Sequence, residues 1–223
     1  MKKLLLFMLI TAMQAKVHML TPNIDIVKAP TSWIEIKNKN LTRQKEDFSC
    51  GSASLATILK HYYGQNISEK EILDAVMDMK GLSKESTLKE YKEANGLSFL
   101  DLSQFAFSKG FKAVGLALDM EALKKLKVPV ILYVKIRNDE HFTVYKGMDS
   151  TYAYLADPSF GNTKVRLSKF KEMFYQRDDL KYPGKVLVML PTDKKISGDQ
   201  DFLKIPKKSN LIEKVIRMRQ LKS

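Results

Sequence analysis

The stretch RQKEDFSCGSASLATIL (residues 43–59) holds the only cysteine of the chain, Cys50, at the start of a segment with helical periodicity. From residue 53 onward, apolar residues recur at three- and four-residue spacing, which predicts a helix that begins near Cys50 and buries this stripe. Ser49 precedes it and is a preferred N-cap residue. The positive end of the helix dipole stabilises thiolate over thiol, so we expect a nucleophile here. The small residues 51–53 would let the backbone of a peptide substrate approach closely.

A second chemical signal lies in the C-terminal half, where the pattern becomes strand-like. His141 opens an alternating run, and Asp157 follows a second run that begins at Tyr152. Two antiparallel strands joined by a turn at residues 147–150 would set Asp157 close to His141. Gln44 lies on the loop before the cysteine helix, where its amide could point to the space beside the sulfur. A thiolate needs a base and an oxyanion donor to act as a peptidase, and these residues could supply both.

The chain order Gln44, Cys50-Gly51, His141-Phe142 and Asp157-Pro158 resembles that of the bacteriocin-processing (double-glycine leader) peptidases, a family of papain-like cysteine peptidases. The resemblance extends over roughly residues 40–191. It implies that Cys50 is the nucleophile and His141 the general base. It further implies that Asp157 orients His141 and that Gln44 donates to the oxyanion.

Many members of that family sit at the front of a peptide-exporting ATP-binding transporter. This sequence contains no membrane-spanning bundle and no phosphate-binding loop of the G-x-x-x-x-G-K-[ST] type. We therefore expect a stand-alone, secreted member, and we do not carry the double-glycine preference over to it.

The order of the expected elements indicates an α+β fold. Helices are expected at residues 50–63, 69–79, 102–109, 121–127 and 168–175, with a polar connection at 81–96. Strands are expected at residues 33–36, 111–118, 128–136, 141–147, 153–156, 164–167 and 185–190. An N-terminal helical half with the nucleophile helix would pack on a C-terminal antiparallel sheet that carries the base. The resemblance makes this a papain-like fold, with the active site in the cleft between the halves.

The composition is that of a globular protein, 44% hydrophobic and 28% charged, with a formal net charge of +13. The positive residues are scattered over helices and loops, so we interpret most of them as solvated surface. A negatively charged protein or envelope surface would be attracted. No zinc-finger, homeodomain or aromatic single-strand-binding pattern accompanies the charge, so we expect no nucleic-acid partner. Three histidines and one cysteine do not make a zinc set, and we expect no metal or other cofactor.

We predict three parts: a signal peptide (residues 1–15), a papain-like peptidase domain (16–191), and a basic linker with a C-terminal amphipathic helix (192–223). Residues 1–15 have a basic start, a short apolar run and a small residue at a plausible cleavage point. The run is too short to span a bilayer, and the alternative is an uncleaved anchor. The mature chain is expected in the bacterial periplasm or outside the cell, with no transmembrane domain.

The two pieces of the C-terminal part differ in pattern. Residues 192–209 have the polar composition of a linker, and residues 210–222 show a basic amphipathic pattern. Such a helix could dock on its own domain, on an envelope export partner or on a membrane surface.

We expect a cysteine endopeptidase that cleaves an exported peptide or protein. One hypothesis links it to secretion or assembly of an extracellular fibre or amyloid, because stand-alone secreted relatives resemble proteins of such systems. The alternative is a peptidase-like binding module that holds an export substrate without turning it over, and the retained Cys50 argues against it.

The site residues also have structural interpretations. A lone cysteine is commonly a buried, inert core residue. His141 could be an ordinary structural histidine, as we take His18 and His61 to be. Asp157 could cap the turn before Pro158. Gln44 could bond its own loop.

Overall fold

The structure is a computed structural model, and it describes residues 17–21, 24–28, 31–82, 97–137 and 139–205. The chain divides into two compact units, residues 1–37 and 38–223. In the first unit, β1 (Val17–Thr21) pairs antiparallel with β2 (Ile24–Lys28), and α1 (Trp33–Asn38) ends at the boundary. The predicted signal peptide lies outside the described residues.

The strand predicted at residues 33–36 is wrong, because this segment belongs to α1. Its alternating apolar and polar residues resembled a strand, but a capping box favours the helix. The backbone N–H of Glu35 donates to Ser32 Oγ (3.1 Å), and the backbone N–H of Ser32 donates to the Glu35 carboxylate (2.8 Å).

The second unit begins with helices. They are α2 (Cys50–His61), α3 (Glu69–Met79) and α5 (Phe99–Ser108). The side chain of Ser68 caps α3 at its predicted start. A capping box between Ser98 and Asp101 begins α5 three residues before the predicted start at residue 102. Most of the predicted connection at 81–96 lies outside the described residues.

The sheet contains six antiparallel strands in the order β3-β8-β4-β5-β6-β7. The strands are β3 (Phe111–Leu118), β4 (Val130–Ile136), β5 (Asp139–Met148), β6 (Tyr152–Asp157), β7 (Gly161–Arg166) and β8 (Gly184–Pro191). Helix α6 (Met120–Lys125) connects β3 to β4, and α7 (Leu167–Phe174) lies between β7 and β8. The strands and helices predicted between residues 111 and 190 are confirmed, with small shifts at their ends.

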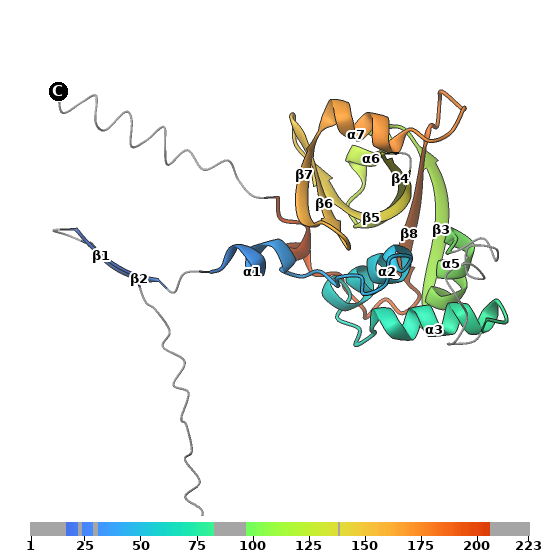
Figure 1. Ribbon diagram of the computed structural model, residues 1–223, viewed down its shortest axis with the longest axis horizontal. Helices are drawn as coiled ribbons and strands as arrows, with labels where there is room; N and C mark the ends of the chain where they lie inside the picture. The colour runs from blue at the N-terminus through green and yellow to red at the C-terminus, as the bar shows by residue number, and fades with distance from the viewer. Residues whose placement is uncertain (1–16, 22–23, 29–30, 83–96, 138, 206–223) are drawn as a thin grey trace, which may run out of the picture. The chain divides into compact units, whose positions relative to one another are not determined.

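The sheet separates two apolar cores. Helix α2 lies on one face, with α3 and α5 on the same side, while α6 and α7 lie on the other (Figure 1). Ile131 and Val144 face α2, whereas Leu132 and Tyr145 pack with α7. Helix α2 is buried along residues 51–59, not only along one stripe as predicted. The predicted α+β arrangement, with the nucleophile helix packed on an antiparallel sheet, is confirmed.

The linker predicted for residues 192–209 is wrong over its described part. Phe202, in the short 3-10 helix η1 (Gln200–Leu203), is fully buried, and its ring centroid lies 5.9 Å from that of Tyr62. The backbone N–H of Asp199 donates to the carbonyl oxygen of Tyr62 (2.7 Å). The chain after β8 therefore packs on the core, and the predicted helix at 210–222 lies outside the described residues. In the part of the chain that the structure describes, no helix combines the length and apolar character of a membrane span.

Candidate active site

Cys50 is the first residue of α2 and carries a free, partly exposed thiol. Ser49 occupies the predicted N-cap position, but its side chain makes no cap hydrogen bond. Its hydroxyl lies instead 2.5 Å from Glu69 Oε1 and 2.9 Å from the carbonyl oxygen of Glu46. The positive end of the α2 dipole therefore lies at Cys50, and the side chain of Ser49 does not occupy the first-turn N–H groups.

His141 lies on β5, and Asp157 ends the neighbouring strand β6. His141 Nε2 is 2.9 Å from Asp157 Oδ2, as the predicted hairpin requires. Asp157 Oδ1 accepts hydrogen bonds from the backbone N–H groups of Ser159 and Phe160, each at 2.9 Å. Asp157 therefore contacts the imidazole and also caps the following turn, so its two interpretations are compatible.

Burial and hydrogen bonding act in opposite directions on the pKa of His141. Burial alone lowers this pKa, but the hydrogen bonds and negative charges of Asp157 and Cys50 outweigh it and raise the pKa from 6.5 to about 9. Burial likewise acts to raise the pKa of Asp157, but the hydrogen bond and charge of His141 outweigh it and lower that pKa below 3.8. The pair is therefore an imidazolium and a carboxylate at neutral pH.

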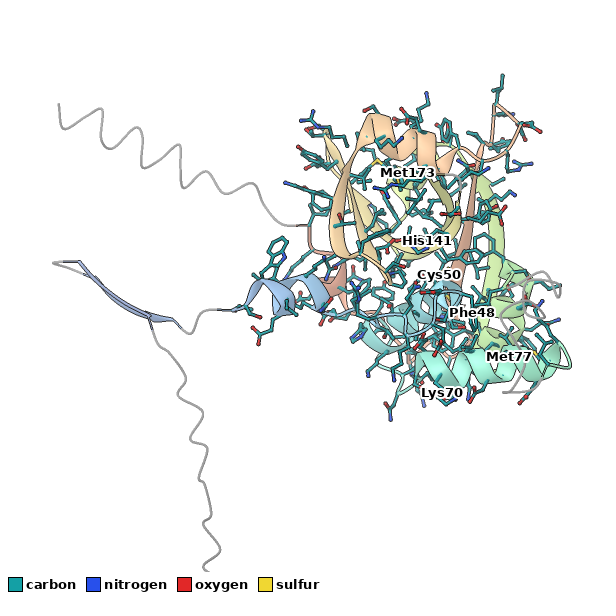
Figure 2. All side chains as sticks on the ribbon, viewed as in Figure 1. Phe48, Cys50, Lys70, Met77, His141 and Met173 are labelled. Atoms are coloured by element: carbon teal, nitrogen blue, oxygen red, sulfur yellow. The ribbon has the colours of Figure 1, made fainter. Side chains whose placement is uncertain are left out.

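The thiol of Cys50 interacts with the imidazole of His141 and is one of the groups that raise the pKa of that ring. Figure 2 shows them next to each other where the sheet meets the start of α2. Because Nε2 of His141 contacts Asp157, Nδ1 is the ring nitrogen that remains for the thiol. The base thus lies between the nucleophile and an orienting carboxylate, which is the geometry that thiol catalysis needs.

Gln44 lies on the irregular loop between α1 and α2. Its backbone N–H donates to the carbonyl oxygen of Pro158 (3.2 Å), and its Oε1 accepts from Ser159 Oγ (2.6 Å). Its Nε2 donates one hydrogen to the carbonyl oxygen of Glu46 (3.1 Å). A primary amide has two N–H donors, so one remains for an oxyanion. Gln44 therefore binds its own loop through one N–H of Nε2, and the second N–H is not used in that bond.

The structure brings the four predicted residues into one series of contacts. Cys50 contacts His141, His141 contacts Asp157, and the turn after Asp157 contacts Gln44. Their catalytic roles remain predictions.

The expectation that residues 51–53 give access to a substrate backbone is wrong, because these residues are buried. A Cβ atom added to Gly51 would lie 3.1 Å from Phe142 Cδ2 and 3.2 Å from Leu97 Cδ1. The small residue at position 51 thus permits α2 to pack closely on β5 at Phe142. The preceding residue of β5 is His141.

Sequence reasoning missed three neighbours of the site. Ser159 fixes the Gln44 amide, and Glu69 binds the loop that contains it. The ring of Phe160 is half-exposed, with its centroid 6.2 Å from that of the His141 imidazole. The Asp-Pro-Ser order is a turn signal that could have revealed Ser159. Glu69 carried no such signal, since an acidic residue is ordinary in the first turn of a helix.

His61 takes no part in this series of contacts. It is the last residue of α2, at the opposite end from Cys50. Its Nε2 lies 3.5 Å from Thr42 Oγ1, and burial and the neighbouring Lys60 lower the pKa of His61. The side chain of His18 lies outside the described residues.

The fold and these contacts define a papain-like cysteine peptidase domain. The Peptidase C39 family matches residues 38–93 and 84–177, and the chain belongs to this family. The crystal structure of a double glycine motif protease from an AMS/PCAT transporter, in complex with the leader peptide, is similar to this chain. The TM-score is 0.51 with 28% identity over 68% of this chain and 91% of that one. The predicted family and fold are confirmed.

Two further relatives extend the comparison. The chain is 32% identical over 145 residues to the "Probable functional amyloid protease FapD" of Pseudomonas aeruginosa, covering 65% of this chain and 61% of that protein. The chain thus matches 61% of the length of this curated relative. The peptidase domain of Streptococcus ComA, a bifunctional transporter of a quorum-sensing pathway, shares the fold, with a TM-score of 0.51 and 22% identity over 68% of this chain and 97% of that one.

Proposed function

We propose that this chain is a cysteine endopeptidase that cleaves an exported peptide or protein. The observation that carries the proposal is the contact series from Cys50 through His141 to Asp157 at the positive end of α2. A pKa of about 9 makes His141 an imidazolium at neutral pH, the form that can pair with a thiolate and later give a proton to the leaving group.

The first half-reaction transfers the acyl group to sulfur. The thiolate of Cys50 attacks the scissile carbonyl carbon, a C–S bond forms, and one carbonyl electron pair moves to oxygen. This oxyanion accepts hydrogen bonds from Gln44 Nε2 and from the backbone N–H of Cys50. As the C–N bond breaks, the imidazolium of His141 gives its proton to the leaving amine.

The second half-reaction releases the acyl group. His141, now neutral, accepts a proton from water while the water oxygen attacks the thioester carbonyl. The C–S bond breaks and returns the thiolate of Cys50, next to a protonated His141. Asp157 stabilises that imidazolium through both half-reactions, since its carboxylate is within hydrogen-bond distance.

For location and substrate, we propose a periplasmic or secreted enzyme that supports secretion or assembly of an extracellular fibre, amyloid or peptide. The signal-peptide pattern of residues 1–15 supports the location. Similarity to a probable functional amyloid protease supports the fibre context, and similarity to a double glycine motif protease supports a peptide substrate.

The test uses p-nitrophenyl acetate, whose acyl transfer to sulfur releases a coloured phenolate. The wild-type chain is expected to acylate at Cys50 with a burst of p-nitrophenolate, while Cys50→Ala shows none. Equal traces for the two proteins would contradict the peptidase assignment and favour a binding module that holds its substrate without turnover. Peptide-library cleavage by wild type, with Cys50→Ala as the control, then gives the preferred sequence.

We further propose that the basic segment at 210–222 contacts an envelope export partner. Because Phe202 is buried, a truncation that tests this segment should begin after residue 205 and keep η1. Loss of partner co-purification, with the p-nitrophenyl acetate burst retained, is the expected result. Co-purification that survives the truncation would contradict this role.

A further inference from the structure

Glu69 is a carboxylate buried beneath the loop that leads to Cys50. It is the first residue of α3 and only 4% exposed. Its Oε1 accepts a hydrogen bond from the backbone N–H of Lys45 (2.9 Å) and lies 2.5 Å from Ser49 Oγ. Burial of a carboxylate costs free energy unless hydrogen bonds compensate for it. The hydrogen bonds from Lys45 and Ser49 supply this compensation.

The two donors mark the two ends of one loop. Lys45 directly follows Gln44, and Ser49 directly precedes Cys50. One carboxylate oxygen therefore connects the neighbour of the proposed oxyanion donor with the neighbour of the proposed nucleophile. On its other side, the loop is held by Pro158 and Ser159, which bond Gln44.

We propose that Glu69 is a positioning residue that sets the separation and orientation of the Gln44 amide relative to the Cys50 thiol. This role rests on the proposed function. Without the carboxylate, the Lys45 N–H and the Ser49 hydroxyl lose their shared acceptor, and the loop between them loses its attachment to α3. The oxyanion donor then moves relative to the sulfur, while the contact of Cys50 with His141 stays in place.

Glu71 provides the matched comparison. It lies in the same first turn of α3, but its carboxylate is 42% exposed and pairs with Lys109 at the surface (2.6 Å). An exposed pair of this kind contributes little to stability. Glu71→Ala therefore removes a first-turn carboxylate without touching the loop before Cys50.

The experiment compares two reactions of Cys50. Acylation by p-nitrophenyl acetate passes through a tetrahedral oxyanion and so needs the Gln44 amide. Alkylation by iodoacetamide is a direct displacement of iodide by the thiolate at a saturated carbon and forms no oxyanion. A defect in acylation alone thus reports on the oxyanion donor, and a defect in both reports on the thiolate or the fold.

Glu69→Ala is expected to slow acylation roughly tenfold or more, because a buried hydroxyl and a partly buried backbone N–H lose their acceptor, and to leave alkylation within about twofold of wild type. Glu69→Gln keeps an acceptor oxygen and should recover most of the acylation rate. Glu71→Ala should match wild type in both reactions. In a Gln44→Ala background, Glu69→Ala should slow acylation by less than about twofold, since the two residues act through one donor.

Ser49→Ala removes one of the two hydrogen bonds to Glu69, and it is the alternative variant if Glu69→Ala does not fold. It should slow acylation roughly threefold with unchanged alkylation. Unchanged acylation in both variants, parallel losses in both reactions, or full additivity with Gln44→Ala would overturn the positioning role. A wild type that acylates no faster than Cys50→Ala would overturn the proposed function itself, and this role with it.

Discussion

The hairpin β5–β6 carries His141, the loop around Gln44 leads into Cys50, and these two parts of the site are built in different ways. Main-chain pairing of β5 with β6 fixes the hairpin. In this hairpin, Nε2 of His141 lies 2.9 Å from Oδ2 of Asp157. The Gln44 loop belongs to no helix or strand, and separate hydrogen bonds to Pro158, Ser159 and Glu69 hold it. Substitutions in the hairpin should therefore change charge and proton affinity, while substitutions around the loop should change geometry.

The largest effect is expected for His141→Ala, which removes the base from the hairpin side. Acylation by p-nitrophenyl acetate should fall by about 10² to 10⁴, the range for loss of general acid–base catalysis. His61→Ala is the control, because His61 lies at the other end of α2 and should leave the rate unchanged. A comparable loss in both variants would show that the assay does not report on the contact with Cys50.

Gln44→Ala tests the loop side. Loss of one oxyanion donor costs about 2.7 to 4 kcal/mol of barrier, so acylation should slow by about 10² to 10³. Alkylation by iodoacetamide should not change, because it forms no oxyanion. If alkylation slowed as much as acylation, the loop would act on the thiolate, and the contrast with the hairpin would be wrong.

Asp157→Asn tests whether charge is the property that the hairpin controls. Without the carboxylate, the pKa of His141 should drop from about 9 by one unit or more toward 6.5. A titration of the histidine ring signals by NMR measures this shift. The pKa of His61, which burial lowers, should stay where it is. A His141 pKa that does not move would contradict the assigned cause.

The stability difference between wild type and Asp157→Asn should depend on pH. A raised pKa for His141 stabilises the fold below about pH 6.5, and this contribution is lost as the pH rises through about 9. A lowered pKa for Asp157 stabilises it above about pH 3.8 and is lost in stronger acid. Between about pH 3.8 and 6.5, where both contributions are present, the free energy of unfolding of the wild type should exceed that of Asp157→Asn by about 1.5 to 3 kcal/mol. Denaturant titrations at pH values inside and above this range should show the difference shrinking at high pH; a constant difference would contradict the pair.

Ser159→Ala should give the smallest effect. It removes the hydrogen bond to Gln44 Oε1, worth about 0.5 to 1.5 kcal/mol, so acylation should slow by about two- to tenfold. The matched test is the same substitution in a Gln44→Ala background, where it should add almost nothing. An equal loss in both backgrounds would mean that Ser159 acts through another residue.

Sequence reasoning predicted the hairpin side of the site better than the loop side. The contact of His141 with Asp157 follows from two short strands and one turn, and pairing register is a local property of a hairpin. The contacts of Gln44 with Ser159 and of Lys45 with Glu69 join distant segments without periodicity. They arise from tertiary packing: the Asp-Pro-Ser order marks Ser159 as a turn residue, but nothing in the sequence pattern indicates that its partner is Gln44 or that Glu69 binds Lys45.

Two errors in the fold have physical causes of the same kind. The alternation at residues 33–36 favoured a strand, but the reciprocal hydrogen bonds of Ser32 and Glu35 start a helix there. The polar composition of residues 192–209 indicated a linker, but one apolar side chain, Phe202, anchors the described part to the core. In both cases a few specific contacts outweighed the average character of the segment.

In the proposed mechanism, His141 holds Cys50 as a reactive thiolate. The most direct test is the rate of Cys50 alkylation by iodoacetamide in wild type and His141→Ala across about pH 5 to 9, a range that contains the ordinary pKa values of histidine and cysteine. If His141 stabilises the thiolate, wild type is alkylated fast already near pH 6, whereas His141→Ala is alkylated slowly, with a rate that rises only toward pH 9. Equal rates and equal pH profiles in the two proteins would contradict it.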